Sequence, residues 1–525
     1  MHRILWLLAV CVAAACAAPE AHVFKRSDGS AAGISMPIYR RDDTHAGRAA
    51  DRVVSPEWLQ SETHKLRAKY RITDRHEKRQ AAALADFGMD SFYFATVKIG
   101  TPPQEFNLVL DTGSSDTWVV STGCTSEQCP PNVHKFDSSK SHTFHSSDQP
   151  FHVTYGTGGI NKGRLVSDTM SIANFTVASQ TFAEALDMRK NTVRAPTSGI
   201  MGLGFESLAT SGATPLWQVL MMEKKVEERV FSFQLKNNMR DVHQSEEIRP
   251  GGIFTLGMLD KSQYQGDINW VKVPSRFGNK GVGYWAIPLD HVKVNRRRLP
   301  PGSNPYAVID TGTTLIGGPP DAVRAIYSSI PGARPAQVGE GYFAFPCHTR
   351  FSIKFNFGGH DYEIDRENIN LGRMSSGSDM CVGAIFAQQT GPHMPGWIVG
   401  DSFLKTVFSA FRYEPQSIGF AQLNAHGAET LPLDRVNTQS VKNEPHSAIS
   451  SVPGGGGPGG GGGGGPRTIT RGSEPTALQG GKNLPKPSVV STPSNMSIPA
   501  RSAASKVGVD VALVGGALAL GALLW

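Results

Sequence analysis

Hydrophobic residues along this chain fall mostly in short runs, in which apolar and polar positions alternate, and glycines are frequent between the runs. Alternation with a period of two is typical of β-strands that bury one face, and glycine favours the turns that join them. Long amphipathic stretches are few. Two short helices are expected, over residues 215–224 and 320–329, and the second begins with a Pro-Pro-Asp start signal. The pattern therefore predicts a mostly β core.

One pattern occurs twice along the chain, over residues 106–115 and 306–314. Each copy is a short apolar run that ends in an aspartate, followed by Thr, Gly and two hydroxyl residues. The copies end in Asp111-Thr112-Gly113-Ser114-Ser115 and Asp310-Thr311-Gly312-Thr313-Thr314. Glycine lets two backbones approach closely, and hydroxyls can hydrogen-bond carboxylate oxygens. The repetition predicts two β-rich lobes, each with one loop, and the two facing loops bring Asp111 and Asp310 together.

Two carboxylates at contact distance cannot both ionise, so Asp111 and Asp310 are expected to share one proton. A water between them can then lose a proton to the ionised carboxylate as it attacks a peptide carbonyl, whose oxygen the other carboxyl protonates. For a single motif the alternative is a turn that follows a strand. Two copies with matching apolar lead-ins favour amide hydrolysis instead. No zinc-protease, nucleophile-elbow or phosphate-loop motif occurs, so no metal and no cofactor is expected.

On these residues the chain resembles the pepsin family of aspartic proteases, over about residues 94–423. Further segments carry the resemblance: the lead-in 93–104, the run 116–119, a flap-like segment 153–158, and two apolar-Gly segments at 199–204 and 397–401. The resemblance implies a mostly β, bilobal pepsin-like fold with a cleft between the lobes. The protease domain is expected over residues 80–432, with an N-lobe of about 80–265 and a C-lobe of about 266–432.

The resemblance also implies roles for residues around the aspartates. Tyr155, which precedes Gly156 and Thr157 in the flap, is expected to close over substrate, although a tyrosine in a glycine-rich hairpin can simply cap a turn. The indole N–H of Trp118 is expected to meet the Tyr155 hydroxyl. One pair of hydroxyl residues is expected to brace the loops against each other, and a second pair to bond the outer carboxylate oxygens. These pairs are Thr112 with Thr311, and Ser114 with Thr313.

The chain departs from the family pattern at Arg412, where an Asp usually follows the late Phe. This departure leaves the local packing open and does not touch the chemistry.

The first 17 residues are typical of a secretory signal, with Arg3, an apolar stretch and small residues at the end. Its removal would leave four cysteines, which predict disulfides in a secreted chain and allow three pairings. Close spacing favours Cys124–Cys129, and the family resemblance supports Cys347–Cys381. A zinc site is the alternative, although the nearest histidines form no paired ligand spacing with these cysteines.

Residues 18–79 are polar, mixed in charge and dotted with basic pairs, the last of which is Lys78-Arg79. This segment resembles a pro-segment that a processing protease removes after Arg79. Lysines can cover an ionised carboxylate pair at neutral pH and lose that attraction when acid protonates the pair. Lys65 and Lys69 are the candidates for the covering charge. A solvated linker is the alternative.

Residues 433–505 are rich in Gly, Ser and Pro, which predicts a disordered stalk. Residues 506–525 end in an apolar run with no basic residue after it, shorter than the ~20 residues that a spanning helix needs. We interpret them as a glycosylphosphatidylinositol (GPI) attachment signal. A retained membrane helix is the alternative. Glycosylation triplets begin at Asn174 and Asn495.

The formal net charge of +7 is concentrated at the ends of the chain. Residues 1–79 hold 14 Lys and Arg against 9 Asp and Glu, residues 436–525 hold 7 against 3, and residues 80–435 are nearly neutral with 31 against 33. No nucleic-acid partner is therefore expected. The sequence predicts a monomeric aspartic endopeptidase that is secreted, anchored at the cell surface like fungal yapsin-like relatives, and active on proteins at acidic pH.

Two alternatives concern the activity itself. A catalytically silent, pepsin-fold binding protein is the rival function, but such relatives usually have a broken Asp-Thr-Gly motif and both copies here are intact. For specificity, an apolar preference is favoured over a basic one. A pocket for Lys or Arg needs a carboxylate, and Thr157, directly after the flap Tyr155-Gly156, has none.

Overall fold

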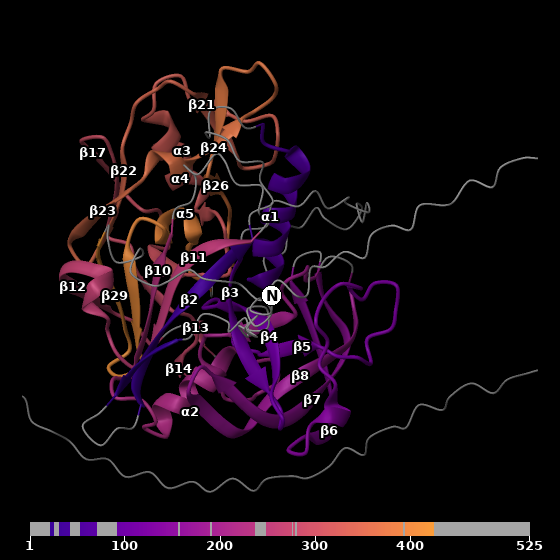
Figure 1. Ribbon diagram of the computed structural model, residues 1–525. Coiled ribbons are helices and arrows are strands. Elements are labelled where there is room, and N and C mark those ends of the chain that lie inside the picture. The colour runs from indigo at the N-terminus through magenta and orange to yellow at the C-terminus, as the bar shows by residue number, and fades with distance from the viewer. Residues whose placement is uncertain are drawn as a thin grey trace, which may run out of the picture. The chain divides into compact units, whose positions relative to one another are not determined.

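The computed structural model describes residues 21–25, 31–41, 53–70, 92–155, 158–189, 192–236, 248–275, 277–278, 281–391 and 394–424. Described residues belong to one compact unit, and most of its regular structure is strand (Figure 1). The prediction of a mostly β fold is confirmed. The predicted signal peptide, stalk and hydrophobic tail lie outside the described residues, as do Lys78, Arg79, Gly156, Thr157 and Asn495.

Strands from both halves of the chain join in one sheet, which has 14 strands within the described residues. Its order is β12-β29-β28-β10-β11-β2-β3-β4-β9-β5-β8-β7-β6, with β1 paired to β2. The bounds are β1 (His22–Lys25), β2 (Ala31–Arg41), β3 (Phe92–Ile99), β4 (Gln104–Asp111), β5 (Trp118–Val120), β6 (His145–Tyr155), β7 (Gly158–Ile172), β8 (Phe175–Met188), β9 (Gly199–Gly202), β10 (Val230–Leu235), β11 (Ile248–Leu256), β12 (Tyr264–Lys272), β28 (Phe408–Arg412) and β29 (Ser417–Leu423). The predicted lobe boundary at 265/266 falls inside β12.

The second half of the chain adds four smaller sheets within the described residues. Their orders are β15-β18-β27-β19-β26, β17-β16-β22-β23, β20-β21-β25-β24 and β13-β14. The bounds are β13 (Phe277–Gly278), β14 (Gly281–Val282), β15 (Ala286–Pro288), β16 (His291–Val294), β17 (Arg297–Leu299), β18 (Tyr306–Ile309), β19 (Ile316–Gly318), β20 (Arg334–Pro335), β21 (Phe343–Pro346), β22 (Ile353–Phe357), β23 (His360–Ile364), β24 (Asn370–Arg373), β25 (Met380–Gly383), β26 (Ile385–Ala387) and β27 (Trp397–Val399).

The same strand arrangement occurs once in each half. In the first half, β4 runs parallel to β9, β9 runs antiparallel to β5, and β5 runs parallel to β8. In the second half, β18, β27, β19 and β26 repeat these three pairings in the same order. The duplicated motif thus corresponds to a duplicated topology, and the bilobal pepsin-like fold implied by the resemblance is confirmed.

Helices are short. They are α1 (Pro56–Lys69), α2 (Leu216–Met222), α3 (Pro320–Ser328), α4 (Arg366–Ile369) and α5 (Asp401–Leu404), and short 3-10 turns cover Ser138–Lys140, Glu206–Leu208 and Lys261–Gln263. The two predicted helices correspond to α2 and α3, within about two residues at each end. Among the described residues, no helix is long and apolar enough to cross a membrane.

The segment before residue 79 is part of the fold rather than a solvated linker. Strand β2 lies between β3 and β11 in the large sheet, and Ile34 and Ile38 on it are fully buried. Helix α1 begins at the Ser55 side chain, which accepts the Trp58 N–H at 3.3 Å. The alternative of a solvated linker is therefore wrong for these residues. A polar, mixed-charge composition had suggested it, yet the apolar residues of 31–39 find their partners in other strands.

Cysteine pairing follows the expectation. Disulfides join Cys124 to Cys129 and Cys347 to Cys381, so the zinc alternative is wrong. Within the described ranges, no group of His, Cys, Asp and Glu is placed to hold a metal ion.

The departure from the family pattern at Arg412 has a local explanation. Its guanidinium lies 3.5 Å from the centre of the Trp270 ring, across the β28-β29-β12 edge of the large sheet. A cation over an indole face is a favourable contact, so the arginine packs where an aspartate had been expected.

Candidate active site

Each aspartate of the duplicated motif stands at the end of a buried strand. Asp111 is the last residue of β4 and lies opposite Gly202 of β9. Asp310 directly follows β18, and its N–H donates to the Val399 carbonyl of β27 at 3.0 Å. The two side chains are 3% and 0% exposed. The repeated topology therefore delivers two buried carboxylates to equivalent positions.

The glycines of the motif allow the two loops to meet. A Cβ atom on Gly113 would lie 2.5 Å from Asp310 Oδ1, and one on Gly312 would lie 2.3 Å from Asp111 Oδ1. Both distances are too short for real atoms, so each glycine makes room for the carboxylate of the opposite loop. The prediction that the loops face each other and bring the aspartates together is confirmed.

Two threonines tie the loops together with a symmetrical set of hydrogen bonds. The Thr112 hydroxyl accepts the Thr311 N–H at 2.9 Å and donates to the Ile309 carbonyl at 2.8 Å. In return, the Thr311 hydroxyl accepts the Thr112 N–H at 3.1 Å and donates to the Leu110 carbonyl at 2.8 Å. Each of the two hydroxyls donates one bond and accepts one bond across the interface, so each loop fixes the position of the other.

Within each loop, further donors orient the carboxylate. Ser114 donates to Asp111 Oδ2 at 2.5 Å, and Thr313 donates to Asp310 Oδ2. On the inner side, the backbone N–H of Gly113 donates to Asp111 Oδ1 at 2.9 Å, and Gly312 makes the same bond to Asp310. Each carboxylate is thus held by one hydroxyl and one backbone N–H, in the manner the sequence predicted for the hydroxyls.

A lysine from the N-terminal segment lies between the two carboxylates. The Nζ atom of Lys69, at the end of α1, is 2.6 Å from Asp111 Oδ1, 2.9 Å from Asp310 Oδ1 and 3.0 Å from Asp310 Oδ2. Of the two candidate covering lysines, Lys69 therefore has the predicted position. Lys65 instead lies 3.2 Å from Glu62 of the same helix.

Charges at this site shift the pKa values of all three groups. Burial raises the pKa of Asp111, and the neighbouring Asp310 adds to the rise against the effect of Lys69. Burial would raise the pKa of Asp310 too, but the Lys69 ammonium and the hydroxyl of Thr313 outweigh it, so its pKa is lowered. Burial would lower the pKa of Lys69, but its two carboxylate partners raise it. The two aspartates are therefore inequivalent, which suits a pair that shares a proton.

Tyr155 and Trp118 meet as the resemblance implied. The Trp118 indole N–H donates to the Tyr155 hydroxyl at 3.1 Å, and their rings stack with centres 6.3 Å apart. Tyr155 ends β6, so this contact fixes the hairpin of β6 and β7 above the first lobe. Burial raises the pKa of the Tyr155 hydroxyl, which therefore stays protonated. The flap residues Gly156 and Thr157 lie outside the described part of the chain.

Two site residues were missed by the sequence reasoning. Tyr70 follows Lys69, is fully buried, and donates its hydroxyl to Asp310 Oδ2 at 2.8 Å. An aromatic residue beside a covering lysine was the available signal. Asp401, in the second apolar-Gly segment, is 1% exposed, and burial raises its pKa well above the usual range. It belongs to the segment 397–401 that carries the family resemblance, but no role was predicted for it.

Two buried carboxylates that duplicated loops bring together, each held by a hydroxyl and a backbone N–H, are the arrangement of the aspartic peptidase class. A family model described as "Eukaryotic aspartyl protease" matches residues 92–423 of this chain. The chain belongs to the eukaryotic aspartyl protease family, and it is an aspartic-type endopeptidase.

Curated relatives agree with this assignment. The chain is 39% identical to "Major aspartyl peptidase 1" of Cryptococcus neoformans var. grubii, over 67% of this chain and 74% of that protein. It is 32% identical to "Aspartic protease" of Phaffia rhodozyma, over 74% of this chain and 91% of the relative. It is also 33% identical to "Cathepsin D" of Clupea harengus, over 64% and 82% of the two chains.

Proposed function

We propose that this protein hydrolyses peptide bonds in protein substrates at acidic pH, with a water activated between Asp111 and Asp310. The observation that carries the proposal is Lys69, because one nitrogen atom within 3.0 Å of both carboxylates marks a point that a polar atom can share between them. A water at that point would lose a proton to the ionised aspartate while it attacks the carbonyl carbon. The protonated aspartate would donate to the carbonyl oxygen, which yields a neutral tetrahedral intermediate.

The hydrogen bonds around the pair support the division of roles. Each outer oxygen accepts from a hydroxyl and each inner oxygen from a backbone N–H, so the carboxylates keep their orientation while the proton moves. A catalytically silent binding protein is the rival function. Both loops keep every donor that orients a carboxylate, and a silent protein has no use for that set.

The N-terminal segment acts as an inhibitory pro-segment in this proposal. Lys69 and Tyr70 occupy all the space that a substrate carbonyl and the attacking water would need, since three of their hydrogen bonds end on Asp310 and one on Asp111. Removal after Lys78-Arg79 by a processing protease would free the aspartates. Strand β2 of the same segment pairs with β3 and β11 of the enzyme body. This pairing would keep the segment docked over the site until the processing protease removes it.

Apolar residues beside the cleaved bond are the proposed substrate preference. The Tyr70 ring packs 5.4 Å from the Tyr284 ring, in a buried cluster with Ala286, Val308 and Ile398. This cluster borders the aspartates and accepts a large aromatic side chain. Asp116 is the acidic residue nearest to Asp111 along the chain. The N–H groups of Thr210 and Ser211 donate to its two carboxylate oxygens, so it is not free to pair with a basic substrate residue.

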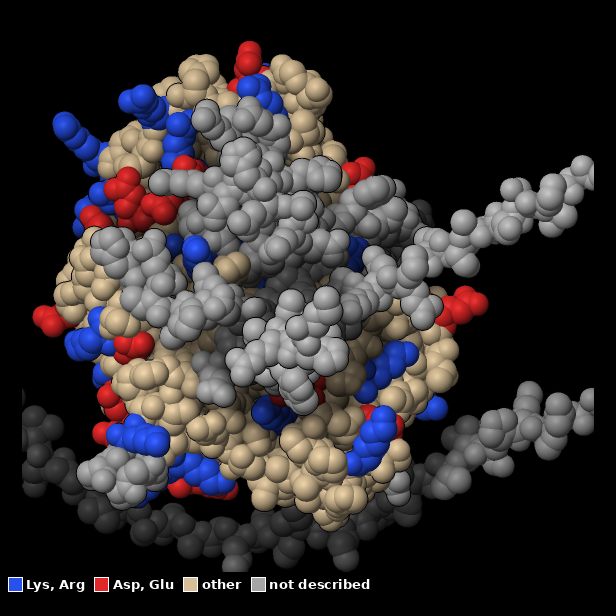
Figure 2. Space-filling model, viewed as in Figure 1, with Lys and Arg blue, Asp and Glu red and all other residues tan. Residues whose placement is uncertain are grey.

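Localisation in the proposal is the secretory pathway followed by the cell surface. Two disulfides and the leader-like N-terminus support secretion. Asn174, the first residue of a glycosylation triplet, is exposed in the turn between β7 and β8. On the described residues visible in Figure 2, charges of both signs are interspersed, which does not favour a nucleic-acid partner. A monomer held by a C-terminal lipid anchor is the proposed form.

The first prediction concerns the aspartate pair. Asp111→Asn or Asp310→Asn lowers kcat at acidic pH by at least about 1,000-fold, because an amide can neither accept the proton of water nor share one. Peptide hydrolysis by the processed enzyme and circular dichroism measure activity and folding. Asp267→Asn, at an exposed position, is the matched control and keeps full activity. Turnover near the wild-type rate in either pair variant would refute the mechanism.

The second prediction concerns the covering lysine. The lowered pKa of Asp310 means that its bond to Lys69 favours the inhibited form above the usual aspartate range, and this preference is lost as pH falls through the lowered pKa. Asp111, with its raised pKa, takes up a proton at higher pH. The full-length precursor should therefore bind a statine-type transition-state mimic weakly at neutral pH. Its binding should become strong once the pH is lower than about 4.

Variants of the two lysines distinguish loss of the Lys69 contact from a general destabilisation of the N-terminal segment. The Lys69→Met precursor should bind the mimic already at about pH 4.5, where a free aspartate pair of this kind still largely shares one proton. Lys65→Met, on the same helix, should follow the wild-type pH curve. Superimposable curves for Lys69→Met and the wild type would contradict the inhibitory role.

The third prediction concerns specificity. Cleavage of a peptide mixture by acid-activated enzyme should occur mainly between apolar or aromatic residues, because the described residues packed around Tyr70 are mainly apolar and aromatic. Tyr284→Ser should weaken the preference for aromatic residues and leave the cleavage of small apolar residues less affected. A profile dominated by cuts beside Lys or Arg would overturn the assignment.

The fourth prediction concerns the anchor. A phosphatidylinositol-specific phospholipase should release the protein from membranes, since a lipid would have replaced residues near 506–525. Mature protein that still contains Trp525 would support the retained membrane helix instead. A chain that ends before the glycine-rich run at 454 should be soluble and active, because the stalk contributes no residue of the site.

A further inference from the structure

The β6-β7 hairpin, which carries Tyr155, leaves the first lobe at a defined point. Ile160 of β7 pairs with Met188 at the end of β8, and among the described residues this is the last regular pair that joins the two strands. Gly158 and Gly159 continue β7 and pair only with Tyr155 and Thr154 on β6. The end of the hairpin is therefore held by the β6-β7 pairing, and a further group is needed to attach it to the rest of the lobe.

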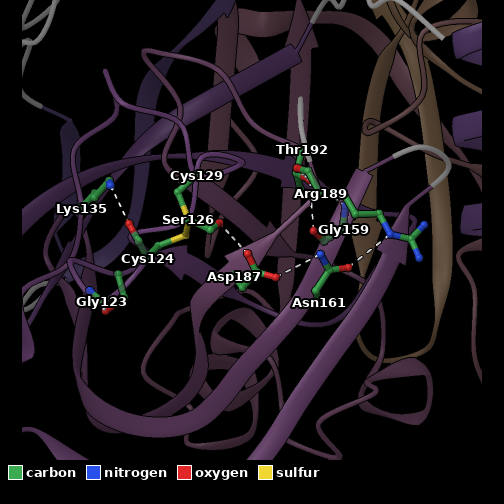
Figure 3. Close-up of a disulfide and its surroundings, with 11 residues drawn as sticks. Gly123, Cys124, Ser126, Cys129, Lys135, Gly159, Asn161, Asp187, Arg189 and Thr192 are labelled. Carbon is green, nitrogen blue, oxygen red and sulfur yellow. Dashed lines mark hydrogen bonds between the residues drawn. A yellow bond between two sulfur atoms is a disulfide. The ribbon is translucent and has the colours of Figure 1, made fainter. Parts of the chain in front are cut away.

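Thr192 supplies that group. Its hydroxyl accepts the Gly159 N–H at 2.7 Å, and its oxygen lies 3.1 Å from the Gly159 carbonyl oxygen and 2.7 Å from that of Arg189. The Arg189 N–H also donates to the Gly159 carbonyl at 2.8 Å. Figure 3 shows Thr192, Arg189 and Gly159 together at the end of the β7-β8 pair. Thr192 thus satisfies a backbone N–H for which β8 has no further partner.

Gly159 is suited to this contact because it has no side chain. Its φ is +137°, a conformation that favours glycine, and a Cβ atom on it would lie 2.3 Å from the Val153 carbonyl oxygen. On the same turn, a Cβ atom on Gly158 would lie 3.1 Å from the Thr192 hydroxyl. The backbone of the hairpin therefore lies directly against Thr192, and a shift of one moves the other.

A second contact fixes the same junction one residue further into the lobe. Asp187 of β8 accepts from Ser126 at 2.6 Å and from the Asn161 amide of β7 at 3.2 Å. Ser126 lies inside the loop that the Cys124–Cys129 disulfide closes (Figure 3). The hydrogen bond from Ser126, followed by that from Asn161, lowers the pKa of Asp187, because both bonds favour the ionised carboxylate. These bonds hold β7 and β8 together next to the point where Thr192 contacts Gly159.

We propose that Thr192 is a positioning residue for substrate binding: its hydroxyl holds β7 at Gly159 and thereby keeps Tyr155 in place beside Trp118. Gly159 lies opposite Thr154, the neighbour of Tyr155, so displacement of β7 changes the 3.1 Å bond between Trp118 and Tyr155. Thr192 touches neither Asp111 nor Asp310, so it acts on binding and not on the chemical step. The inference rests on the proposed function for its kinetic consequence only.

Hydrogen exchange tests the contact without any need for activity. In the full-length protein, Thr192→Val should accelerate exchange of the peptide that contains the Gly159 amide by about three- to tenfold, which corresponds to the loss of one hydrogen bond. Thr192→Ser, which keeps the hydroxyl, should exchange as the wild type does. Thr169→Val is the matched control, because Thr169 also lies on β7 and donates its hydroxyl to the Ala178 carbonyl at 3.1 Å, but at the far end of the strand.

Exchange of β3 peptides serves as the internal reference for overall folding. Acceleration at Gly159 alone supports the proposal. The proposal would be overturned if Thr192→Val left exchange of the Gly159 peptide unchanged. It would also be overturned if Thr169→Val accelerated exchange of the Gly159 peptide as much as Thr192→Val does. This result is independent of whether the protein cleaves any peptide, so failure of the proposed function and failure of this inference are distinguishable.

Kinetics test the consequence for substrate. In the acid-activated enzyme, Thr192→Val should raise KM by about three- to tenfold with kcat within about twofold of wild type, since the loss affects binding. Thr192→Ser should restore KM. A fall in kcat with unchanged KM, or no recovery in Thr192→Ser, would refute the positioning role.

Discussion

Two buried carboxylates held face to face are the constraint on which the rest of the structure depends. Burial and mutual repulsion make such a pair costly, and the protein offsets this with donors from both loops and with the Thr112–Thr311 interlock. The interlock needs the two loops to leave their lobes at equivalent positions and in equivalent directions. The arrangement of β4, β9 and β5 is repeated by β18, β27 and β19 with the same parallel and antiparallel pairings, and the glycines keep the meeting point free of side chains.

The same electrostatic requirement explains the N-terminal segment. An ammonium group between two carboxylates stabilises their ionised forms, and Lys69 has this position with Tyr70 as an additional donor. Helix α1 presents both residues from one end, and β2 binds the segment through backbone pairing to β3 and β11. One part of the segment thus contacts the charged pair, and the other pairs with strands of the enzyme body. In the proposed inhibition, proton uptake by the aspartates weakens the first set of contacts and leaves the backbone pairing of β2 unchanged.

The hairpin above the first lobe is governed by hydrogen bonds of a different kind. Tyr155 and Trp118 contact each other through a neutral bond that pH does not change in the acidic range, because burial keeps the tyrosine protonated. Behind them, Thr192 and Asp187 hold β7 where its pairing with β8 ends. Charged contacts thus link the N-terminal segment to the aspartates, and a neutral hydrogen bond links Tyr155 of the hairpin to Trp118. The two can vary independently.

Local sequence was enough to predict the features that follow from short-range chemistry. The Asp-Thr-Gly repeats, the strand-like runs that precede them, helices α2 and α3, and the Cys124–Cys129 loop are each specified within a few residues. The resemblance to a family added the Cys347–Cys381 pair and the bond between Trp118 and Tyr155. Tertiary structure alone decided between Lys65 and Lys69, placed Tyr70 on Asp310, and put β2 in the large sheet. These outcomes depend on charges and strand edges that lie far away along the chain, and only the folded position of helix α1 decides which of its two candidate lysines reaches the carboxylate pair.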